Sequence, residues 1–259
     1  MIKKLIVPFA LFFLFTPVSN TSLPDINNPD PAFSGMHIQM DDYYMWLYGR
    51  LGNEVSKPEY EIFKQALTGF FNLKGKNKIS KNLLTIIDFS LSSKLERMWI
   101  LDVNKMEVIH NTLVAHGRNS GDEFARYFSN KPSSYQSSLG FYLTDGLYHG
   151  KHGLSLYLDG VEPGINDKAR ERTIVMHSAD YVSKDFIQNY GRLGRSFGCP
   201  SIPLENHQEI IEKLSGRSCL YIHYPDTEYL ETSHLLNPES ALEAAVMFLN
   251  KFHGIPEGS

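Results

Sequence analysis

The stretch "RTIVMH" at residues 172–177 is an apolar, β-branched run that ends on a histidine, and "GRLGRSFGCPSIP" follows at residues 191–203. The first segment has the composition of a short strand, which would place His177 at the rim of a sheet. The second is a glycine-rich turn in which Cys199 lies between Gly198 and Pro200. A thiol beside an imidazole forms a nucleophile–base pair, so these two segments predict a strand-rich fold with a reactive edge.

Similar short runs on both sides of this stretch predict a mainly antiparallel sheet. They are rich in β-branched or aromatic residues, are bounded by Gly, Asn, Asp or Ser, and lie at residues 83–89, 97–103, 107–117, 153–161, 172–177 and 218–224. Leu154, Leu156 and Leu158 alternate with polar residues, which is typical of a half-buried strand. We therefore expect an α+β fold with a β-sandwich or barrel-like sheet, and not a doubly wound parallel layer.

Helical patterns flank the strand-rich region. Residues 37–74 are predicted to be helical, with Ser56 as a possible N-cap, and their apolar side chains fall on one face: Phe63, Ala66, Leu67, Phe70 and Phe71. Two further helices are expected at residues 204–216 and 237–254, the second of them capped by Asn237.

The composition describes a globular chain without a nucleic-acid-binding surface. Of the 259 residues, 42% are hydrophobic and 21% are charged, and the formal net charge is −4. A nucleic-acid partner would require a basic face, which this charge balance does not favour.

The N-terminus has the pattern of a secretory signal at residues 1–19. Lys3 and Lys4 precede an apolar run at residues 5–15, and small residues with Pro17 follow it. This run is shorter than the roughly 20 apolar residues that span a bilayer, although an uncleaved anchor is an alternative. Export would bring the chain into an oxidising compartment, where its cysteines could form a disulfide.

The chain contains two cysteines, Cys199 and Cys219. A disulfide between them is one interpretation for an exported protein. However, Cys219 lies in "SCLYIHY", which resembles a buried strand, and a thiol in such a strand usually behaves as a small hydrophobic side chain. We predict that both cysteines remain thiols.

A serine hydrolase is a rival hypothesis, because Gly194–Gly198 matches the pattern G-x-S-x-G around Ser196. In such enzymes the serine lies on a sharp turn between a strand and a helix. Here Pro200 and Pro203 follow, and they prevent a helix from continuing directly from the serine.

A zinc peptidase is a second rival. His149 and His152 form an H-x-x-H pattern, and His177 could complete a set of three ligands. No glutamate follows His149, and the glycine between the two histidines favours a loop or hairpin over the helix that usually carries H-E-x-x-H. We therefore predict no metal and no cofactor.

The combination "RTIVMH…RLGRSFGC" resembles the catalytic domain of bacterial murein L,D-transpeptidases, the YkuD-like group. The motif of that family is a strand-end histidine, a spacer and then Ser/Thr-His-Gly-Cys, and 21 residues separate His177 from Cys199 here. The resemblance extends upstream through "NTLVAHGRNSG" at residues 111–121 and covers roughly residues 80–230. One residue departs from the motif, because Phe197 replaces the histidine before the glycine.

The resemblance implies a covalent mechanism on peptidoglycan stem peptides. Cys199 would attack the carbonyl that joins the L-centre of meso-diaminopimelate to D-alanine, and His177 would act as general acid and base. An amine of a second stem would resolve the acyl-enzyme into a 3→3 cross-link, whereas water would make the protein an L,D-carboxypeptidase. Ser196 would orient His177 or the substrate, Gly198 would shape the site, and Arg195 would hold a stem carboxylate.

The resemblance also suggests how the chain is organised. We expect a signal peptide at residues 1–19, a flexible lead-in and helical segment at 20–79, the catalytic domain at 80–230, and a C-terminal helix and tail at 231–259. The expected protein is a monomer, exported to the periplasm or cell envelope, and acylated by carbapenems. A wall-binding module without a reactive thiol is the non-enzymatic alternative.

Overall fold

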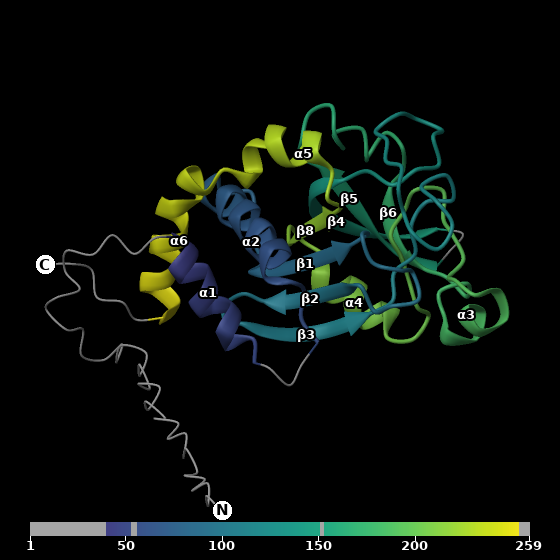
Figure 1. Ribbon diagram of the computed structural model, residues 1–259, viewed down its shortest axis with the longest axis horizontal. Helices are drawn as coiled ribbons and strands as arrows, with labels where there is room; N and C mark the ends of the chain where they lie inside the picture. Colours follow the sequence, from purple (N-terminus) through teal and green to yellow (C-terminus); the bar gives the residue numbers. More distant parts are fainter. Residues whose placement is uncertain (1–39, 53–55, 151–152, 254–259) are drawn as a thin grey trace, which may run out of the picture. The chain divides into compact units, whose positions relative to one another are not determined.

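Eight strands form one continuous sheet in the computed structural model, which describes residues 40–52, 56–150 and 153–253 (Figure 1). The predicted signal segment lies outside the described residues. Across the sheet the order is β3 (Glu107–Thr112), β2 (Met98–Asp102), β1 (Leu83–Asp88), β8 (Cys219–His223), β4 (Gly140–Gly150), β5 (Gly153–Gly160), β6 (Val175–Ser178) and β7 (Ser201–Ile202).

The sheet is mainly antiparallel, as predicted. The pairs β1–β2, β2–β3, β4–β5, β4–β8 and β5–β6 are antiparallel, and the pairs β1–β8 and β6–β7 are parallel. All six predicted strands are present, although the runs at residues 97–103 and 107–117 form shorter strands than expected. Two strands, β4 and β7, were not predicted.

The two edges of the sheet meet at a seam, which gives the sheet its barrel-like character. The chain just beyond β3 bridges to β7, because Ala115 N donates to Ser201 O at 2.9 Å and Ser201 N donates to Ala115 O at 3.3 Å. A second bridge pairs Gly117 with Ser196. This seam, between residues 115–118 and 195–201, holds the segment that contains Cys199.

Helix α2 (Tyr60–Gly75) packs on strands β1 and β8 and is covered by α1 (Met40–Arg50) and α6 (Pro238–His253) (Figure 1). All five apolar residues predicted for one face of this helix are buried. The contact with the sheet is close enough to require glycine at position 69, where an added Cβ would lie 2.0 Å from Cζ of Phe141.

The helical region before β1 differs in detail from the prediction. Two helices replace the continuous one over residues 37–74, and α2 begins at Tyr60 after Glu59. The prediction of Ser56 as an N-cap was wrong, because its hydroxyl oxygen accepts a hydrogen bond from Trp99 Nε1 instead. That bond ties the segment between the two helices to strand β2.

The later helices agree more closely with the sequence. Helix α4 (His207–Leu214) lies inside the predicted range, and Asn237 Oδ1 caps α6 by accepting from Glu239 N at 2.8 Å. The short helices α3 (Lys184–Tyr190), α5 (Thr227–Thr232) and η2 (His234–Leu236) complete the chain. Within the described ranges, none of the helices has both the length and the apolar character needed to cross a bilayer.

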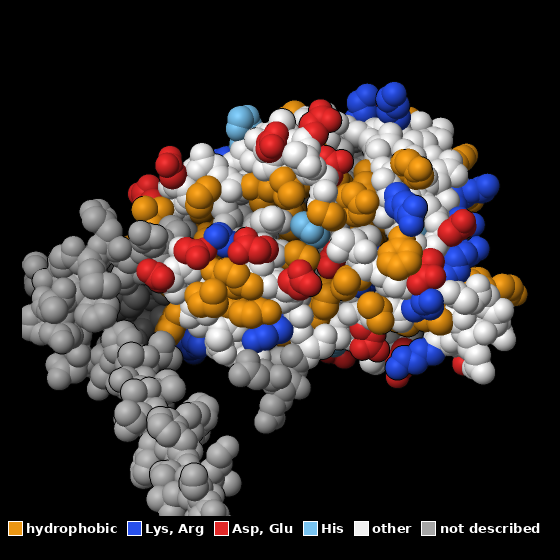
Figure 2. All heavy atoms as spheres, viewed as in Figure 1, with side chains coloured by type: hydrophobic (Ala, Val, Ile, Leu, Met, Phe, Trp, Pro, Cys, Tyr) orange, Lys and Arg blue, Asp and Glu red, His pale blue; other side chains and the backbone are white. Residues whose placement is uncertain are grey.

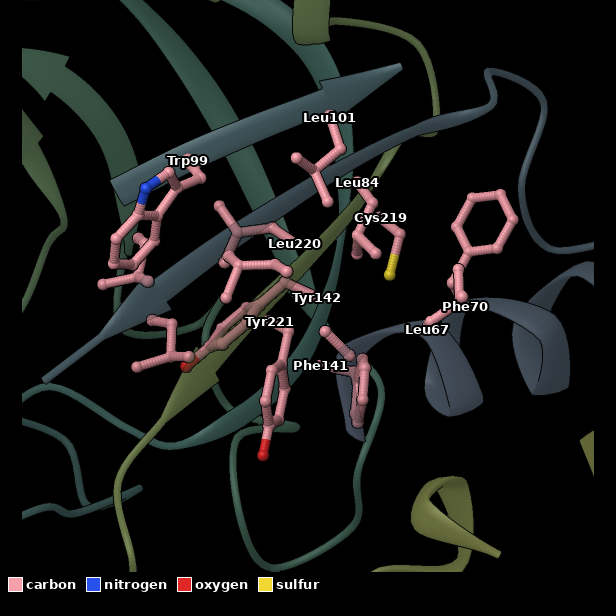
Figure 3. Close-up of a cluster of buried hydrophobic side chains, with 14 of the residues drawn as sticks. Leu67, Phe70, Leu84, Trp99, Leu101, Phe141, Tyr142, Cys219, Leu220 and Tyr221 are labelled. Carbon is pink, nitrogen blue, oxygen red and sulfur yellow. The ribbon is translucent and has the colours of Figure 1, made fainter. Parts of the chain in front are cut away.

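Cys219 lies in the core between the sheet and helix α2. Figure 3 shows it beside Leu84 of β1, with Leu67 and Phe70 of α2 on the facing helix. Its side chain is fully buried, and burial raises the pKa of its thiol. The thiol is therefore a packing group, as the strand pattern predicts, and it forms no disulfide with Cys199.

Candidate active site

Parallel pairing of β6 with β7 brings the two predicted catalytic residues to one place. His177 on β6 is in register with Ser201 on β7, and Cys199 precedes Ser201 by two residues. His177 and Cys199 both line a cavity of about 410 Å³ at this edge of the sheet. His177 lies one residue before the end of β6, close to the strand-end position that was predicted.

The turn before Cys199 is fixed by the hydroxyl of Ser196. Ser196 Oγ donates to the carbonyl of Cys199 at 2.6 Å and accepts from Gly198 N at 3.0 Å. Gly198 has a φ of +121°, and an added Cβ there would lie 2.7 Å from Gln136 O. Ser196 thus holds the turn that carries Cys199, whereas the partners described below hold His177.

The imidazole of His177 is buried and held in one tautomer. Its Nδ1 lies 2.9 Å from the carbonyl of Ser178, which can only accept, so Nδ1 carries the proton. Nε2 is then the basic nitrogen, and Ser201 Oγ donates to it at 3.0 Å. Tyr181 OH lies 3.1 Å from Ser201 Oγ and extends this chain of hydrogen bonds.

Cys199 is partly exposed to the cavity, in contrast to Cys219. Its Sγ lies 3.8 Å from the carbonyl of Thr173. A partly exposed thiol that shares a cavity with a basic imidazole nitrogen can act as a nucleophile once that nitrogen accepts its proton.

The cavity wall combines cationic, aromatic and hydroxyl groups. No Asp or Glu is among the described residues that line it, which are Tyr148, Arg172, Thr173, Val175, His177, Tyr181, Arg195, Ser196, Phe197 and Cys199. A second cavity, of about 460 Å³, lies between β3, α3 and α4, but no cysteine lines it. The cavity of about 410 Å³, which Cys199 and His177 line, is therefore the candidate active site.

Arg195 lies at the cavity but already has an acidic partner. Its Nη1 donates to Asp122 Oδ1 at 2.6 Å and to the carbonyl of Gly121 at 2.9 Å. The carboxylate of Asp122 is therefore the ion-pair partner of this guanidinium. Binding of a stem carboxylate by Arg195 stays a prediction.

Phe197, which replaces the histidine of the family motif, gives the cavity an apolar edge. Its side chain is 57% exposed and its ring centroid lies 4.9 Å from that of Tyr135. The guanidinium of Arg118 spans both rings, at 5.8 Å from Tyr135 and 5.7 Å from Phe197. Tyr135 itself has a φ of 55°, which is uncommon for a bulky residue and is typical of a constrained loop.

Arg172 is a site residue that the sequence analysis did not identify. It is half-buried and its guanidinium donates to four neutral acceptors on the loop at residues 129–138: Ser129 O, Ser138 Oγ, Ser134 Oγ and Gln136 O. Ser201 and Tyr181 were also missed. In the sequence, only the position of His177 near the end of a strand indicates this site. Ser201 and the loop that binds Arg172 lie in other segments of the chain, so no local pattern connects them with His177.

Figure 2 shows an uneven distribution of charge on one face of the molecule. Lys and Arg side chains gather on the side where α3 lies, and Asp and Glu side chains are more frequent on the side of α5 and α6. An uneven field of this kind steers charged ligands toward the region of opposite sign.

The serine-hydrolase hypothesis does not fit the geometry around Ser196. Ser196 is followed by a turn and then by strand β7 instead of the helix that a serine elbow requires. His152, one of the three histidines of the zinc hypothesis, lies outside the described residues, and the described part of the chain contains no cluster of three or more potential metal ligands.

A comparison with protein families identifies the domain. Residues 54–223 match the model of the L,D-transpeptidase catalytic domain, so the chain belongs to this family. The match confirms the predicted family and fold class, and it confirms that the domain is of an enzymatic type. A search of curated proteins finds no match.

A search of solved structures finds similarity to two L,D-transpeptidases and to a helical cell shape determining protein. The L,D-transpeptidase from Mycobacterium smegmatis is 12% identical, with a TM-score of 0.33, over 55% of this chain and 59% of its own. The helical cell shape determining protein Pgp2 from Campylobacter jejuni (K307A mutant) is 12% identical, with a TM-score of 0.40, over 73% and 64%. The L,D-transpeptidase from Stackebrandtia nassauensis is 10% identical, with a TM-score of 0.34, over 73% and 93%. This chain therefore spans about three fifths of the Mycobacterium smegmatis protein.

Proposed function

We propose that the chain is a cysteine L,D-transpeptidase that acts on peptidoglycan stem tetrapeptides. The observation that carries this proposal is the arrangement of Cys199 and His177 in one cavity, with the turn of Cys199 fixed by Ser196 and the proton of His177 fixed on Nδ1. A nucleophile and a base that are both held in place remove much of the entropic cost of covalent catalysis.

The reaction divides into two acyl transfers. In the first, the Cys199 sulfur bonds to the carbonyl carbon between meso-diaminopimelate and D-alanine, and the proton from the thiol is held on His177 Nε2. That proton passes to the departing amine as the carbon–nitrogen bond breaks, and D-alanine leaves. In the second, His177 takes a proton from the attacking amine, the carbon–sulfur bond breaks, and the 3→3 cross-link forms.

The choice between an amine and water as acceptor depends on the cavity edge. Phe197 and Tyr135 place an apolar surface where the family motif has a polar imidazole. A drier site disfavours hydrolysis and favours the amine. The second candidate is therefore an L,D-carboxypeptidase, which would use the same residues with water as the acceptor.

Product analysis tests this proposal. Purified protein incubated with disaccharide-tetrapeptide should release D-alanine and form the 3→3 dimer, with free tripeptide as a minor product. Cys199→Ala should abolish turnover, and Ser196→Ala should reduce it only partly because the thiol remains. Tripeptide as the sole product would identify a carboxypeptidase instead, and loss of activity only in the serine variant would overturn the cysteine mechanism.

The proposed substrate lies outside the cytoplasmic membrane, which fits the signal pattern at residues 1–19. We propose that this segment directs export to the periplasm or cell envelope, where the domain acts as a monomer. Cell fractionation with an antibody to the domain checks the location. Active full-length protein found only in the cytosol would contradict it.

A further inference from the structure

The immediate surroundings of Cys199 contain five titratable or charged groups. Tyr148 comes from β4, His177 from β6, Arg172 from the segment before β6, Tyr181 from the segment after it, and Arg195 from the segment that leads to the nucleophile turn. Of the two arginines, Arg195 is paired with the carboxylate of Asp122. Arg172 is the cation whose charge is not offset by a carboxylate of any described residue.

The contacts of Arg172 hold its charge in place without neutralising it. Both terminal nitrogens donate to oxygens of the loop at residues 129–138, with Nη1 at 2.6 Å from Ser129 O and Nη2 at 2.5 Å from Gln136 O. Carbonyl and hydroxyl oxygens satisfy the hydrogen-bond donors but carry no full negative charge. The positive charge therefore remains available to a nearby anion.

Two groups that can become anions interact with Arg172, the phenol of Tyr142 and the thiol of Cys199, and burial raises the pKa of Tyr142, which leaves the Cys199 thiol as the candidate anion. An added Cβ on Gly198, the residue before Cys199, would lie 3.3 Å from Arg172 Nη2. Burial lowers the pKa of Arg172, whereas electrostatic interactions with Tyr142 and with Cys199 favour the charged guanidinium. By reciprocity, the guanidinium favours the thiolate over the thiol.

We propose that Arg172 is the electrostatic partner of the Cys199 thiolate and keeps the nucleophile ionised in the resting enzyme. This inference rests on the proposed function only in taking Cys199 as the nucleophile. Arg172 forms no covalent bond in the reaction, and its role is to position a fixed positive charge beside the sulfur. Because the site is partly buried, solvent screens this charge less than it would at the surface.

The test is the pH dependence of Cys199 alkylation by iodoacetamide in the full chain, followed by mass spectrometry of the Cys199 peptide. In Arg172→Gln the midpoint should move up by about one pH unit, so that alkylation below the midpoint slows about tenfold. The high-pH plateau should stay near that of the wild type, because access to the sulfur is unchanged. Arg172→Lys, which keeps the charge, should have a midpoint closer to the wild type.

Arg170→Gln is the matched control, because Arg170 is two residues away but pairs with Asp145 and Asp159 on the surface. Its midpoint should equal that of the wild type. If Arg172→Gln does not fold, Ser134→Asp should place a carboxylate against the intact guanidinium and raise the midpoint, whereas Ser134→Asn should not.

An unchanged midpoint in Arg172→Gln would overturn the inference, as would equal shifts in Arg172→Gln and Arg172→Lys. If Arg172→Gln does not fold, an unchanged midpoint in Ser134→Asp would overturn it in the same way. Alkylation needs no peptidoglycan substrate, so these results are independent of the proposed reaction. A protein that forms the 3→3 dimer but shows no shift would retain its function and lose only this role of Arg172.

Discussion

At the scale of single residues, His116 supports the turn at residues 196–199 through a backbone hydrogen bond to Ser196. It is 1% exposed, its carbonyl accepts from Ser196 N at 3.0 Å, and its Nδ1 lies 2.8 Å from Nη2 of the buried Arg97. Since a guanidinium can only donate, Nδ1 accepts, and the ring must be neutral. Burial first, and then the charge of Arg97, lower the pKa of His116 to about 3.

This histidine is expected to make the fold sensitive to acid. The unfolded chain protonates it near pH 6.5, whereas the folded protein keeps it neutral down to about pH 3, so the unfolded state binds more protons between these values. Its contribution to the free energy of unfolding is complete above pH 6.5 and falls by about 1.4 kcal/mol per pH unit below it.

Between pH 7 and pH 5 the wild type should therefore lose about 2 kcal/mol more stability than His116→Gln, whose amide oxygen can still accept from Arg97. Urea unfolding of both proteins at the two pH values measures this difference. Comparison of the two proteins cancels the contribution of His223, whose pKa is also lowered by burial. Equal losses in both proteins would contradict the assignment.

Local sequence predicted the candidate nucleophile and the candidate base but not the groups that surround them. His177 and Cys199 carry chemistry that a pattern of residue types can indicate. Ser201 reaches His177 only because strands β6 and β7 pair in parallel, and Tyr181 hydrogen-bonds to Ser201. Arg172 has no local signal, since its partners lie more than thirty residues earlier in the chain.

At the scale of secondary structure, helix α2 is held against the sheet by a close contact at Gly69. Alanine normally stabilises a helix relative to glycine by about 1 kcal/mol. At this position its Cβ would overlap the Phe141 ring, at 2.0 Å from Cζ, so the helix or the ring must move. Overpacking of this kind usually costs about 1–3 kcal/mol.

We expect Gly69→Ala to lower the free energy of unfolding by about 2 kcal/mol, because an overlap at 2.0 Å belongs at the upper end of that cost and about 1 kcal/mol of helix propensity is subtracted from it. Gly49→Ala in α1 is the control, because nothing lies within 4 Å of its added Cβ. The control should be neutral or slightly stabilising in the same denaturation experiment. A Gly69→Ala protein as stable as the wild type would show that the contact is not tight in solution.

The elements that sequence reasoning missed have identifiable causes. Strand β4 contains glycines at residues 140, 146 and 150, and its register with β5 shifts between Thr144 and Leu147, which breaks the alternation that marks a strand. Strand β7 has two residues and α5 has six, so neither is long enough to show a period. The longer helices were predicted because their apolar spacing extends over several turns.

At the scale of the whole sheet, long-range pairing positions the chemistry. The sheet begins at β3 and ends at β7, and the bridges of Ala115 to Ser201 and Gly117 to Ser196 join these edges beside Cys199. Segments about eighty residues apart in the chain thus form one wall of the site. Periodicity describes single strands and carries no information on which edges meet, which is why the fold class was predictable and the seam was not.

The central claim is that Cys199 forms a covalent acyl-enzyme with a stem peptide, and mass spectrometry of the acid-quenched protein tests it most directly. After incubation with disaccharide-tetrapeptide, the protein should gain the mass of the substrate minus D-alanine, and peptide mapping should locate that mass on Cys199. A carbapenem should label the same residue, and Cys199→Ala should show neither adduct. Folded, reduced protein that gains no mass from either compound and releases no D-alanine would contradict the account.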